Sequence, residues 1–121
     1  MVYIVDDDQN VRDGFTMLLQ SAGFKSNSFE SAEKFLEHFE QNHNHDLLIL
    51  DISLGGMSGC DLMEYLTKRD LHLPVIIITA FDAEATRKAA KNYGALAYLR
   101  KPVDSAALID LIKFNVSNKY S

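Results

Sequence analysis

VYIVDDD, from Val2 to Asp8, begins with four apolar residues and then turns abruptly to three carboxylates. A short run of β-branched and aromatic residues is typical of a buried strand. One aspartate would be enough to cap a following helix, so the other two indicate that a positive charge lies among these side chains in the working protein. This strand end therefore bears on both the fold and a candidate site.

An alternation of strand and helix continues along the chain. Further short β-rich runs are Leu47–Leu50, Val75–Ile78 and Ala97–Leu99, with a weaker, polar candidate at Lys25–Phe29. Apolar residues at helical spacing fill the gaps between these runs. The first predicted helix ends at Gly23, the second begins after Ser31, and the third includes Leu62–Leu66. The fourth runs from Asp82 to Asn92, before Gly94, and the fifth follows Ser105.

This order of elements predicts an α/β protein of the (βα)5 kind. Alternating strands and helices imply a parallel sheet with right-handed crossovers, and all-apolar strands fit burial on both faces. The polar strand at 25–29 is expected at an edge. In a doubly wound sheet of order 2-1-3-4-5, ligands bind beyond the carboxyl ends of the strands, near the switch point between strands one and three.

The composition limits the class of protein. At 121 residues we expect one domain over 1–121, with 117–121 as a flexible tail. A net charge of -5 without a basic tract argues against direct binding of nucleic acid or anionic lipid. The apolar runs are too short to span a membrane. Cys60 is the only cysteine, which fits a reducing compartment, so we expect a cytoplasmic location.

Polar residues end four of the five predicted strands. They are Asp6 and Asp7 after the first, Asp51 at the third, Thr79 at the fourth, and Lys101 with Pro102 after the fifth. Two carboxylates at about 4 Å repel by roughly 4 kcal/mol at an intermediate dielectric, so three need a compensating cation. Hard oxygen ligands without His or Cys favour Mg²⁺ or Mn²⁺. The sequence therefore predicts a metal site at this edge of the sheet.

Taken together, VYIVDDD, LLILDISL, VIIITAF and GALAYLRKPV resemble, in order and spacing, the motifs of response-regulator receiver domains of two-component signalling. The resemblance covers nearly the whole chain and implies a flavodoxin-like fold. It implies that Asp51 accepts a phosphoryl group from a sensor histidine kinase or a phosphotransfer protein. It also implies that Asp7 and Asp51 bind Mg²⁺ directly, that Asp6 binds through water, and that Ser53 adds its backbone carbonyl.

The same resemblance gives roles to residues on the last two strands. Thr79 binds a phosphoryl oxygen, Lys101 pairs with the acidic site, Tyr98 changes rotamer, and the peptide bond before Pro102 is cis. A carboxylate such as Asp51 can attack phosphorus to form an acyl phosphate while the metal and lysine neutralise charge. We expect a switch that assists only its own phosphorylation and dephosphorylation, not an enzyme.

Some residues receive a plainer interpretation or depart from the family pattern. Asp8 is assigned to helix capping. Arg12, five residues past Asp7, could touch the acidic site, but it is assigned to the helix surface. His43 and His45 are assigned to a solvated loop. Gly55 stands where receivers commonly have proline, and the paired glycines predict a more mobile loop after Asp51.

Other functions remain open at this stage. A pseudo-receiver that binds proteins without using phosphate is the main alternative, and the retained Asp51, Thr79 and Lys101 count against it. An enzyme or flavin carrier on the same fold would need a phosphate loop that the sequence lacks, or a second aspartate where Ser53 stands. An output domain, of the helix-turn-helix type, is expected to be lost or supplied separately. We expect a monomer or a weak, phosphorylation-dependent dimer.

Overall fold

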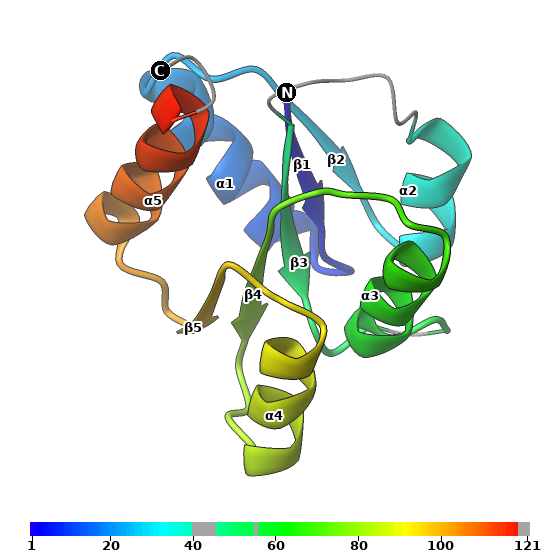
Figure 1. The fold of residues 1–121 in the computed structure, drawn as a ribbon. Coiled ribbons are helices and arrows are strands. Elements are labelled where there is room, and N and C mark those ends of the chain that lie inside the picture. Colours follow the sequence, from blue (N-terminus) through cyan, green and yellow to red (C-terminus); the bar gives the residue numbers. More distant parts are fainter. Residues whose placement is uncertain (40–45, 55, 119–121) are drawn as a thin grey trace.

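Five parallel strands form one sheet that helices cover on both faces (Figure 1). A computed structural model of the chain describes residues 1–39, 46–54 and 56–118. The strands are β1 (Val2–Val5), β2 (Ser26–Phe29), β3 (Leu47–Asp51), β4 (Val75–Thr79) and β5 (Ala97–Arg100). Their order in the sheet is β2-β1-β3-β4-β5. The predicted flavodoxin-like, doubly wound order is therefore confirmed.

In the described part of the chain four helices connect the strands, and a fifth follows β5. They are α1 (Gln9–Ser21), α2 (Ala32–His38), α3 (Gly59–Lys68), α4 (Glu84–Asn92) and α5 (Ser105–Asn118). Helices α1 and α5 pack on one face of the sheet, and α2, α3 and α4 pack on the other (Figure 1). Within the described part of the chain, no helix combines the length and the apolar character needed to cross a bilayer.

The burial of each strand follows its place in the sheet. Every residue of β1, β3 and β4 is buried, as expected for central strands with helices on both faces. Strand β2 lies at one edge and exposes Asn27 and Ser28, so the position predicted for the polar strand is correct. Strand β5 forms the other edge and is only partly buried.

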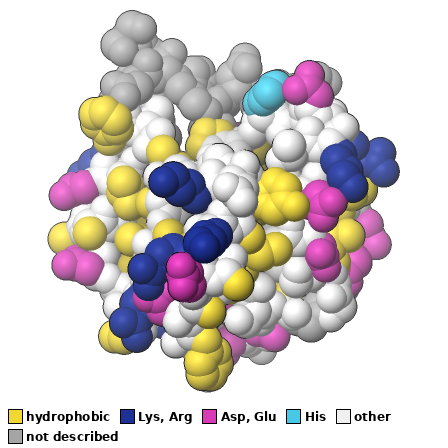
Figure 2. Space-filling view, turned by 60° about the horizontal axis from the view of Figure 1, so that its bottom comes forward, with side chains coloured by type: hydrophobic (Ala, Val, Ile, Leu, Met, Phe, Trp, Pro, Cys, Tyr) yellow, Lys and Arg dark blue, Asp and Glu magenta, His cyan; other side chains and the backbone are white. Residues whose placement is uncertain are grey.

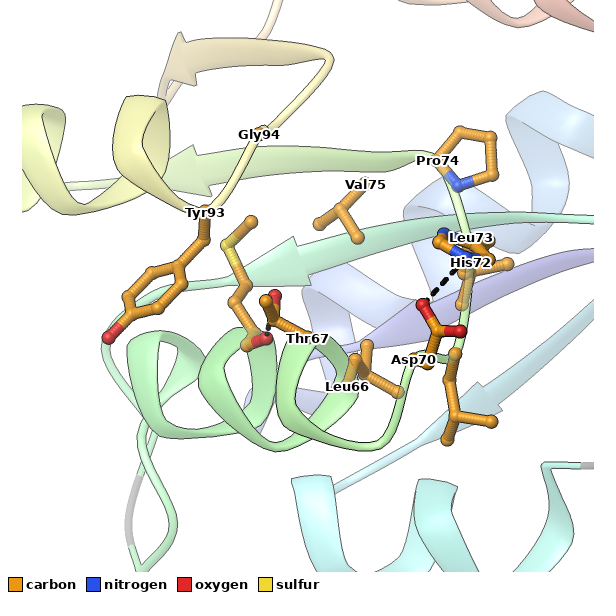
Figure 3. A pocket seen from close by; sticks show the side chains of 11 residues that line it. Leu66, Thr67, Asp70, His72, Leu73, Pro74, Val75, Tyr93 and Gly94 are labelled. Carbon is orange, nitrogen blue, oxygen red and sulfur yellow. Dashed lines mark hydrogen bonds and ion pairs between the residues drawn. The ribbon is translucent and has the colours of Figure 1, made fainter.

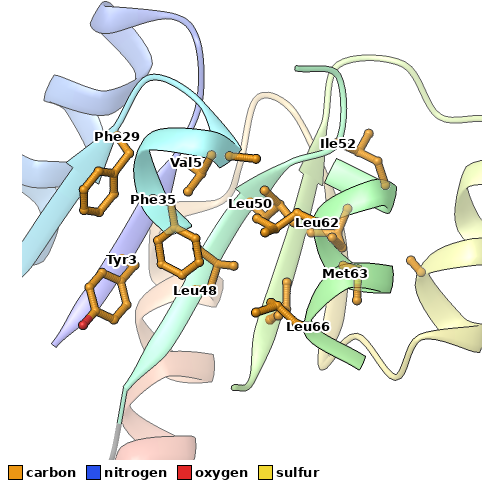
Figure 4. Close-up of a cluster of buried hydrophobic side chains, with 14 residues drawn as sticks. Tyr3, Val5, Phe29, Phe35, Leu48, Leu50, Ile52, Leu62, Met63 and Leu66 are labelled. Carbon is orange, nitrogen blue, oxygen red and sulfur yellow. The ribbon is translucent and has the colours of Figure 1, made fainter. Parts of the chain in front are cut away.

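Two hydrophobic clusters lie on opposite faces of the sheet because successive strand residues point to opposite sides. Figure 4 shows the cluster beneath α2 and α3, in which Phe35 packs against Tyr3 with ring centroids 5.3 Å apart. The other cluster joins Ile4 and Ile49 to Leu19 of α1 and Leu108 of α5. The sheet is thus packed against helices on both sides.

The helix starts depend on which side chain is available as a cap. Asp8 caps α1 by accepting from the Asn10 backbone N at 2.9 Å, as predicted. The fourth helix begins at Glu84 and not at Asp82, because the Asp82 carboxylate pairs with Arg87 instead of capping. The fifth helix already includes Ser105, and its cap is the preceding residue: the Asp104 carboxylate accepts from the Ala107 backbone N at 3.2 Å.

Helix α5 continues further than the sequence suggested. It ends at Asn118, so Ser117 and Asn118 are helical and not part of a tail. Neither Gly nor Pro follows Phe114 to stop the helix, which explains the extension. The predictions for His43, His45 and Gly55, and for residues 119–121, fall outside the described residues.

Three helices end in the same backbone motif, in which one residue adopts a left-handed conformation. At Gly23 and Gly94 the φ angles are 87° and 77°, and at Asp70 the φ angle is 55°. After Asp70 the Leu71 backbone N donates to the Leu66 carbonyl at 2.9 Å, which closes the turn. Asp70 thus occupies a position that suits glycine, because a Cβ is unfavourable there.

Replacing Asp70 by glycine is expected to raise the free energy of unfolding by about 0.5 kcal/mol. The gain is the strain relieved at positive φ, reduced by the extra freedom of glycine in the unfolded chain. Urea denaturation measures it. The matched change Gly94→Ala should lower stability by about 1 kcal/mol; a loss of stability in Asp70→Gly would contradict the strain argument.

Candidate functional site

The carboxyl ends of β1, β3 and β5 bring two aspartates and a lysine into contact. Asp6 follows β1 directly, Asp51 is the last residue of β3, and Lys101 follows β5. The Lys101 Nζ donates to Asp6 Oδ2 at 2.9 Å and to Asp51 Oδ2 at 3.2 Å. Both aspartates are buried, with 0% and 4% of their surfaces exposed. The parallel sheet therefore joins residues that lie far apart in the sequence.

A third carboxylate completes an acidic cluster at the same edge. One oxygen each from Asp6, Asp7 and Asp51 lies within 4.8 Å of the others, and Asp7 is exposed to solvent. Carboxylate oxygens are the ligands that Mg²⁺ prefers, and an exposed side leaves room for water and a phosphoryl oxygen. The residues present therefore fit a divalent cation. The described part of the chain offers no His or Cys to this cluster.

The backbone next to the cluster is also fixed by the aspartates. The Ser53 backbone N donates to Asp51 Oδ1 at 3.0 Å, and the Asp8 backbone N donates to Asp6 Oδ1 at 2.9 Å. Each buried carboxylate thus has one oxygen on a backbone amide and the other on Lys101. This arrangement orients both carboxylates before any ligand arrives.

Burial makes the ionised form of Asp51 less favourable than it is in water. Burial raises the pKa of Asp51 above its ordinary value, and the negative charge of Asp6 adds to the rise, although the Ser53 amide and Lys101 oppose it. At Lys101 burial acts to lower the pKa, but the hydrogen bond to Asp6 and the charge of Asp51 outweigh it and raise the pKa. Lys101 therefore stays charged. Ionisation of Asp51 costs free energy, and a second cation near the carboxylate would reduce that cost.

Asp51→Asn is expected to stabilise the metal-free protein by about 1 kcal/mol near pH 8. Because the folded pKa of Asp51 is raised, wild-type stability is highest below the ordinary aspartate pKa and falls as pH rises through the folded value. The advantage of the variant should therefore disappear near pH 4. Urea denaturation across this range, without and with Mg²⁺, measures it; Mg²⁺ should stabilise wild type more. An advantage that persisted unchanged in acid would contradict this account.

Thr79 and Tyr98 lie on the neighbouring strands, and the Lys101 backbone N donates to the Thr79 carbonyl at 2.8 Å. The Thr79 hydroxyl donates to the Phe81 carbonyl at 2.7 Å and accepts from the Phe81 backbone N at 3.0 Å. Thr79 is fully buried, whereas Phe81 is 77% exposed. The Tyr98 hydroxyl is buried and finds no hydrogen-bond partner among the described residues. The peptide bond between Lys101 and Pro102 is cis.

Arg12 contacts the site, although the sequence interpretation preferred a position on the helix surface to this contact. It was assigned to the helix surface, but its Nη1 donates to the backbone carbonyl of Asp6 at 2.7 Å. Arg12 lies one helical turn after the Asp8 cap, so its side chain reaches back toward the end of β1. The sequence does place the positive charge of Arg12 on the first turns of a helix, six residues after Asp6, and this spacing was the available signal for the contact.

Gly59, the first residue of α3, is a residue that the sequence interpretation missed. A Cβ at this position would lie 2.6 Å from the Ile52 Cα and 2.8 Å from the Asp51 carbonyl oxygen. The Gly59 backbone N donates to the Ile52 carbonyl at 3.2 Å. Helix α3 therefore starts against the backbone of Asp51, and only glycine allows this approach.

Glu33 holds the loop after β3 from the side of α2. Its Oε1 accepts from the Met57 backbone N at 3.1 Å, a contact between residues 24 positions apart. Gly56, at φ 68°, lies so close to the Glu33 carboxylate that a Cβ on residue 56 would lie 3.0 Å from Glu33 Oε2. The described part of this loop is thus fixed by a helix remote in sequence, beside the segment that carries Ser53.

Glu33→Ala is expected to weaken Mg²⁺ binding about threefold, because the loop that carries Ser53 loses its contact with α2. Glu33→Gln keeps an acceptor for the Met57 amide and should bind like wild type. Isothermal titration calorimetry gives the affinities. Both variants should unfold within about 0.5 kcal/mol of wild type, since the contact is at the surface; equal affinities for all three proteins would show that this contact does not position the site.

The described residues line at least two surface grooves. One, of about 360 Å³, opens beside Lys101 between α1 and the start of α5. The other, of about 560 Å³, lies between the last turns of α3 and α4, with Leu66 and Val75 in its floor and the Asp70–His72 pair at its rim (Figure 3). It lies at the opposite end of β4 from Thr79 and contains none of the predicted site residues.

Comparison with known proteins agrees with this geometry. Residues 2–113 match the family described as the response regulator receiver domain. The transcriptional regulatory protein TdiR of Thauera aromatica is 36% identical over 112 residues, which are 92% of this chain and 48% of that protein. The transcriptional regulatory protein FixJ of Azorhizobium caulinodans is 31% identical over 112 residues, which are 93% of this chain and 53% of that protein. The chain belongs to the response regulator receiver domain family.

Solved structures give the same result. The response regulator StyR matches with a TM-score of 0.88 and 41% identity over 98% of this chain and 60% of that one. The crystal structure of FixJ-N matches with a TM-score of 0.85 and 29% identity, over 96% of this chain and 92% of that one. The chain spans about half the length of the two curated relatives named above.

Proposed function

We propose that this receiver domain accepts a phosphoryl group on Asp51 in a Mg²⁺-dependent reaction and changes conformation to control an output. The observation that carries the proposal is the position of Asp51: it ends β3, contacts Lys101 at 3.2 Å, and shares an acidic cluster with Asp6 and Asp7. A nucleophilic carboxylate, a fixed cation and a place for a metal are what phosphoryl transfer to an aspartate requires.

In the proposed reaction a carboxylate oxygen of Asp51 forms a bond to phosphorus. The bond from phosphorus to the donor breaks, and its electron pair leaves with the donor, an imidazole nitrogen of phosphohistidine or the acyl oxygen of acetyl phosphate. Lys101 stabilises the negative charge of the transferring oxygens from one side. When bound, Mg²⁺ would be held by Asp6, Asp7, Asp51 and the Ser53 carbonyl and would neutralise further charge on those oxygens.

The switch that we propose begins at Thr79. Its hydroxyl donates to the Phe81 carbonyl, so recruitment to a phosphoryl oxygen would end that hydrogen bond and release the start of the loop before α4. Tyr98 lies on the adjacent strand with a buried, unpaired hydroxyl, and a change of its rotamer would give that hydroxyl a partner. The two side chains would thus transmit the phosphorylation of Asp51 to the α4–β5 surface.

The groove beside Lys101 is our candidate for the docking site of the phosphoryl donor. It is lined by Asn10, Val11, Gly14, Phe15, Leu18, Lys101, Pro102, Val103 and Ser105. Its lining is largely apolar, and Gly14 adds no side chain that would obstruct an approaching helix. A histidine on such a helix could reach the acidic cluster across Lys101. We propose a sensor histidine kinase or a phosphotransfer protein as this partner.

The wider organisation follows from the same proposal. We propose that residues 1–121 form one receiver unit, monomeric or weakly dimeric when phosphorylated, and that its output is a helix-turn-helix domain or a separate protein. The unit would assist only its own phosphorylation and dephosphorylation and would bind neither nucleic acid nor membrane directly. The single thiol, Cys60, suits a reducing compartment, so we propose the cytoplasm.

Intact mass spectrometry after incubation with acetyl phosphate and Mg²⁺ tests the proposal. Wild type should gain one phosphate, and Asp51→Asn or wild type with EDTA should gain none. Asn keeps the size of the side chain, and circular dichroism checks that the variant is folded. An unmodified wild type, or an adduct that survives Asp51→Asn and EDTA, would overturn the assignment and favour a phosphate-independent protein-binding module.

A further inference from the structure

Asp7 differs from the other two carboxylates of the acidic cluster in how it is held. Asp6 and Asp51 each bind a backbone amide with one oxygen and Lys101 with the other. The Asp7 side chain is exposed and makes neither a hydrogen bond nor an ion pair with any described residue. The direction of the Asp7 carboxylate must therefore be set by its backbone.

Two hydrogen bonds restrain the peptide units on either side of Asp7. Before it, the Arg12 Nη1 donates to the Asp6 carbonyl at 2.7 Å. After it, the Asp8 backbone N donates to Asp6 Oδ1 at 2.9 Å. Asp6 is itself anchored, because its backbone N donates to the Phe29 carbonyl at 3.1 Å. Peptide units are planar, so holding both of them fixes the φ and ψ angles of Asp7 and the direction of its Cα–Cβ bond.

The Asp6 carbonyl depends on Arg12 for its hydrogen bond. Asp6 is fully buried, and no other described residue donates to this carbonyl. A buried carbonyl without a donor costs free energy, so without Arg12 the peptide unit would rotate toward water. The Asp6 carbonyl and the Asp7 N–H belong to the same rigid unit, so Asp7 would turn with it.

The charge of Arg12 acts in the opposite direction from its hydrogen bond. Among the described residues its guanidinium has no ion-pair partner, so its positive charge is not neutralised by a contact. Lys34, and to a smaller extent Arg12, hold the pKa of Glu30 below its usual value, so the guanidinium lies near the start of the segment between β2 and α2. A positive charge close to a cation site disfavours Mg²⁺.

Other cations surround the same end of the sheet. The strands run toward the bottom of Figure 1, and Figure 2 brings this end forward; Lys and Arg side chains gather near the centre of the view, with acidic side chains close by. The loss of one positive charge should therefore change the local field only modestly, and in the direction that favours a bound cation.

From these contacts we propose that Arg12 is a positioning residue for the cation site: it holds the peptide unit between Asp6 and Asp7 so that the Asp7 carboxylate faces the cluster. The inference rests on the proposed function, because a role for Asp7 requires the Mg²⁺ site. Positioning and charge predict opposite effects of removing Arg12. Loss of positioning weakens Mg²⁺ binding, whereas loss of a nearby positive charge strengthens it.

Isothermal titration calorimetry with MgCl₂ on the unphosphorylated protein tests the direction of the effect. Arg12→Met should weaken Mg²⁺ binding about tenfold, because Met keeps the aliphatic part of the side chain and donates no hydrogen bond. Arg12→Lys keeps a donor and the charge and should stay within about threefold of wild type. The matched control is Arg69→Met: Arg69 is exposed at the end of α3, 4.1 Å from the centre of the Tyr65 ring, and its loss should leave the affinity unchanged. Circular dichroism checks that every variant is folded.

A measurement without metal tests the positioning itself. In ¹⁵N relaxation of the metal-free protein, the Asp7 and Asp8 amides should be more mobile in Arg12→Met than in wild type or Arg12→Lys. The amide of Ile49, in the middle of β3, should not change. In the Asp7→Asn background, Arg12→Met should change the Mg²⁺ affinity by about twofold or less, because the carboxylate that Arg12 positions is already absent.

The outcomes separate the inference from the proposed function. Unchanged or tighter Mg²⁺ binding by Arg12→Met, or equal weakening by Arg12→Met and Arg69→Met, overturns the proposal. If Arg12→Met slows phosphorylation by acetyl phosphate but changes neither Mg²⁺ affinity nor the mobility of the Asp7 amide, Arg12 acts on the phosphoryl donor and the positioning role is wrong. If wild type binds no Mg²⁺, the proposed cation site fails. Amide relaxation then still decides whether Arg12 holds this peptide unit: greater mobility in Arg12→Met supports it, and unchanged mobility overturns it.

Discussion

Lys101→Met will lower the free energy of unfolding of the metal-free protein by about 2 to 3 kcal/mol near pH 8. The Lys101 ammonium is shared by two buried carboxylates, and removing it leaves like charges in contact without compensation. Methionine keeps the length of the side chain, so the loss reports charge and not packing. Urea denaturation with circular dichroism measures the change.

The pH and metal dependence of this variant distinguish electrostatics from a packing defect. The loss should shrink toward pH 4, because Asp51, whose pKa is already raised by burial, then becomes neutral. Mg²⁺ should restore part of the lost stability by replacing the missing cation. Lys113→Met, at an exposed position of α5, should stay within about 0.5 kcal/mol of wild type. A loss of stability that changed neither with pH nor with Mg²⁺ would contradict the electrostatic explanation.

Gly59→Ala and Gly14→Ala are expected to change stability in opposite directions. Both glycines are helical, so alanine should gain up to about 1 kcal/mol from helix propensity alone. At Gly14 the added Cβ meets nothing within 4 Å, and we expect this gain. At Gly59 it would lie 2.6 Å from the Ile52 Cα, so α3 or the end of β3 must shift, at a net cost of about 2 kcal/mol.

The displaced backbone belongs to Asp51 and Ile52, so Gly59→Ala should also slow phosphoryl transfer, whereas Gly14→Ala should leave the intrinsic reaction with acetyl phosphate unchanged. Thermal unfolding and the time course of adduct formation by mass spectrometry measure the two effects. A stabilised Gly59→Ala variant would mean that the close approach to β3 is easily relaxed.

The sequence was sufficient for the parts of the fold that local patterns encode. The all-apolar runs located β1, β3 and β4, and the polar run located the edge strand β2. Once the strand order was inferred, the convergence of Asp6, Asp51 and Lys101 followed from where parallel strands end. The structure brings these three residues together; the roles assigned to them remain predictions.

The parts that failed depend on contacts between distant residues. Local spacing gave no indication that Glu33 would hold the Met57 amide or that the α3 backbone would approach Ile52 so closely as to require Gly59. The start of α4 was placed too early for a different, local reason. Asp82 is a favourable cap by residue type, but its pairing with Arg87 took the carboxylate away from that function.

The strand order also has a consequence for the order in which the protein is made. Strand β1 pairs with both β2 and β3, so the β2-β1-β3 half of the sheet can form once residue 51 has left the ribosome. Lys101 is synthesised 50 residues after Asp51. For that interval of several seconds, at about 5 to 20 residues per second, the nascent chain holds its acidic pair without the lysine. A divalent cation from the surrounding solution is then the available counter-charge, so magnesium concentration during translation should affect the yield of folded protein.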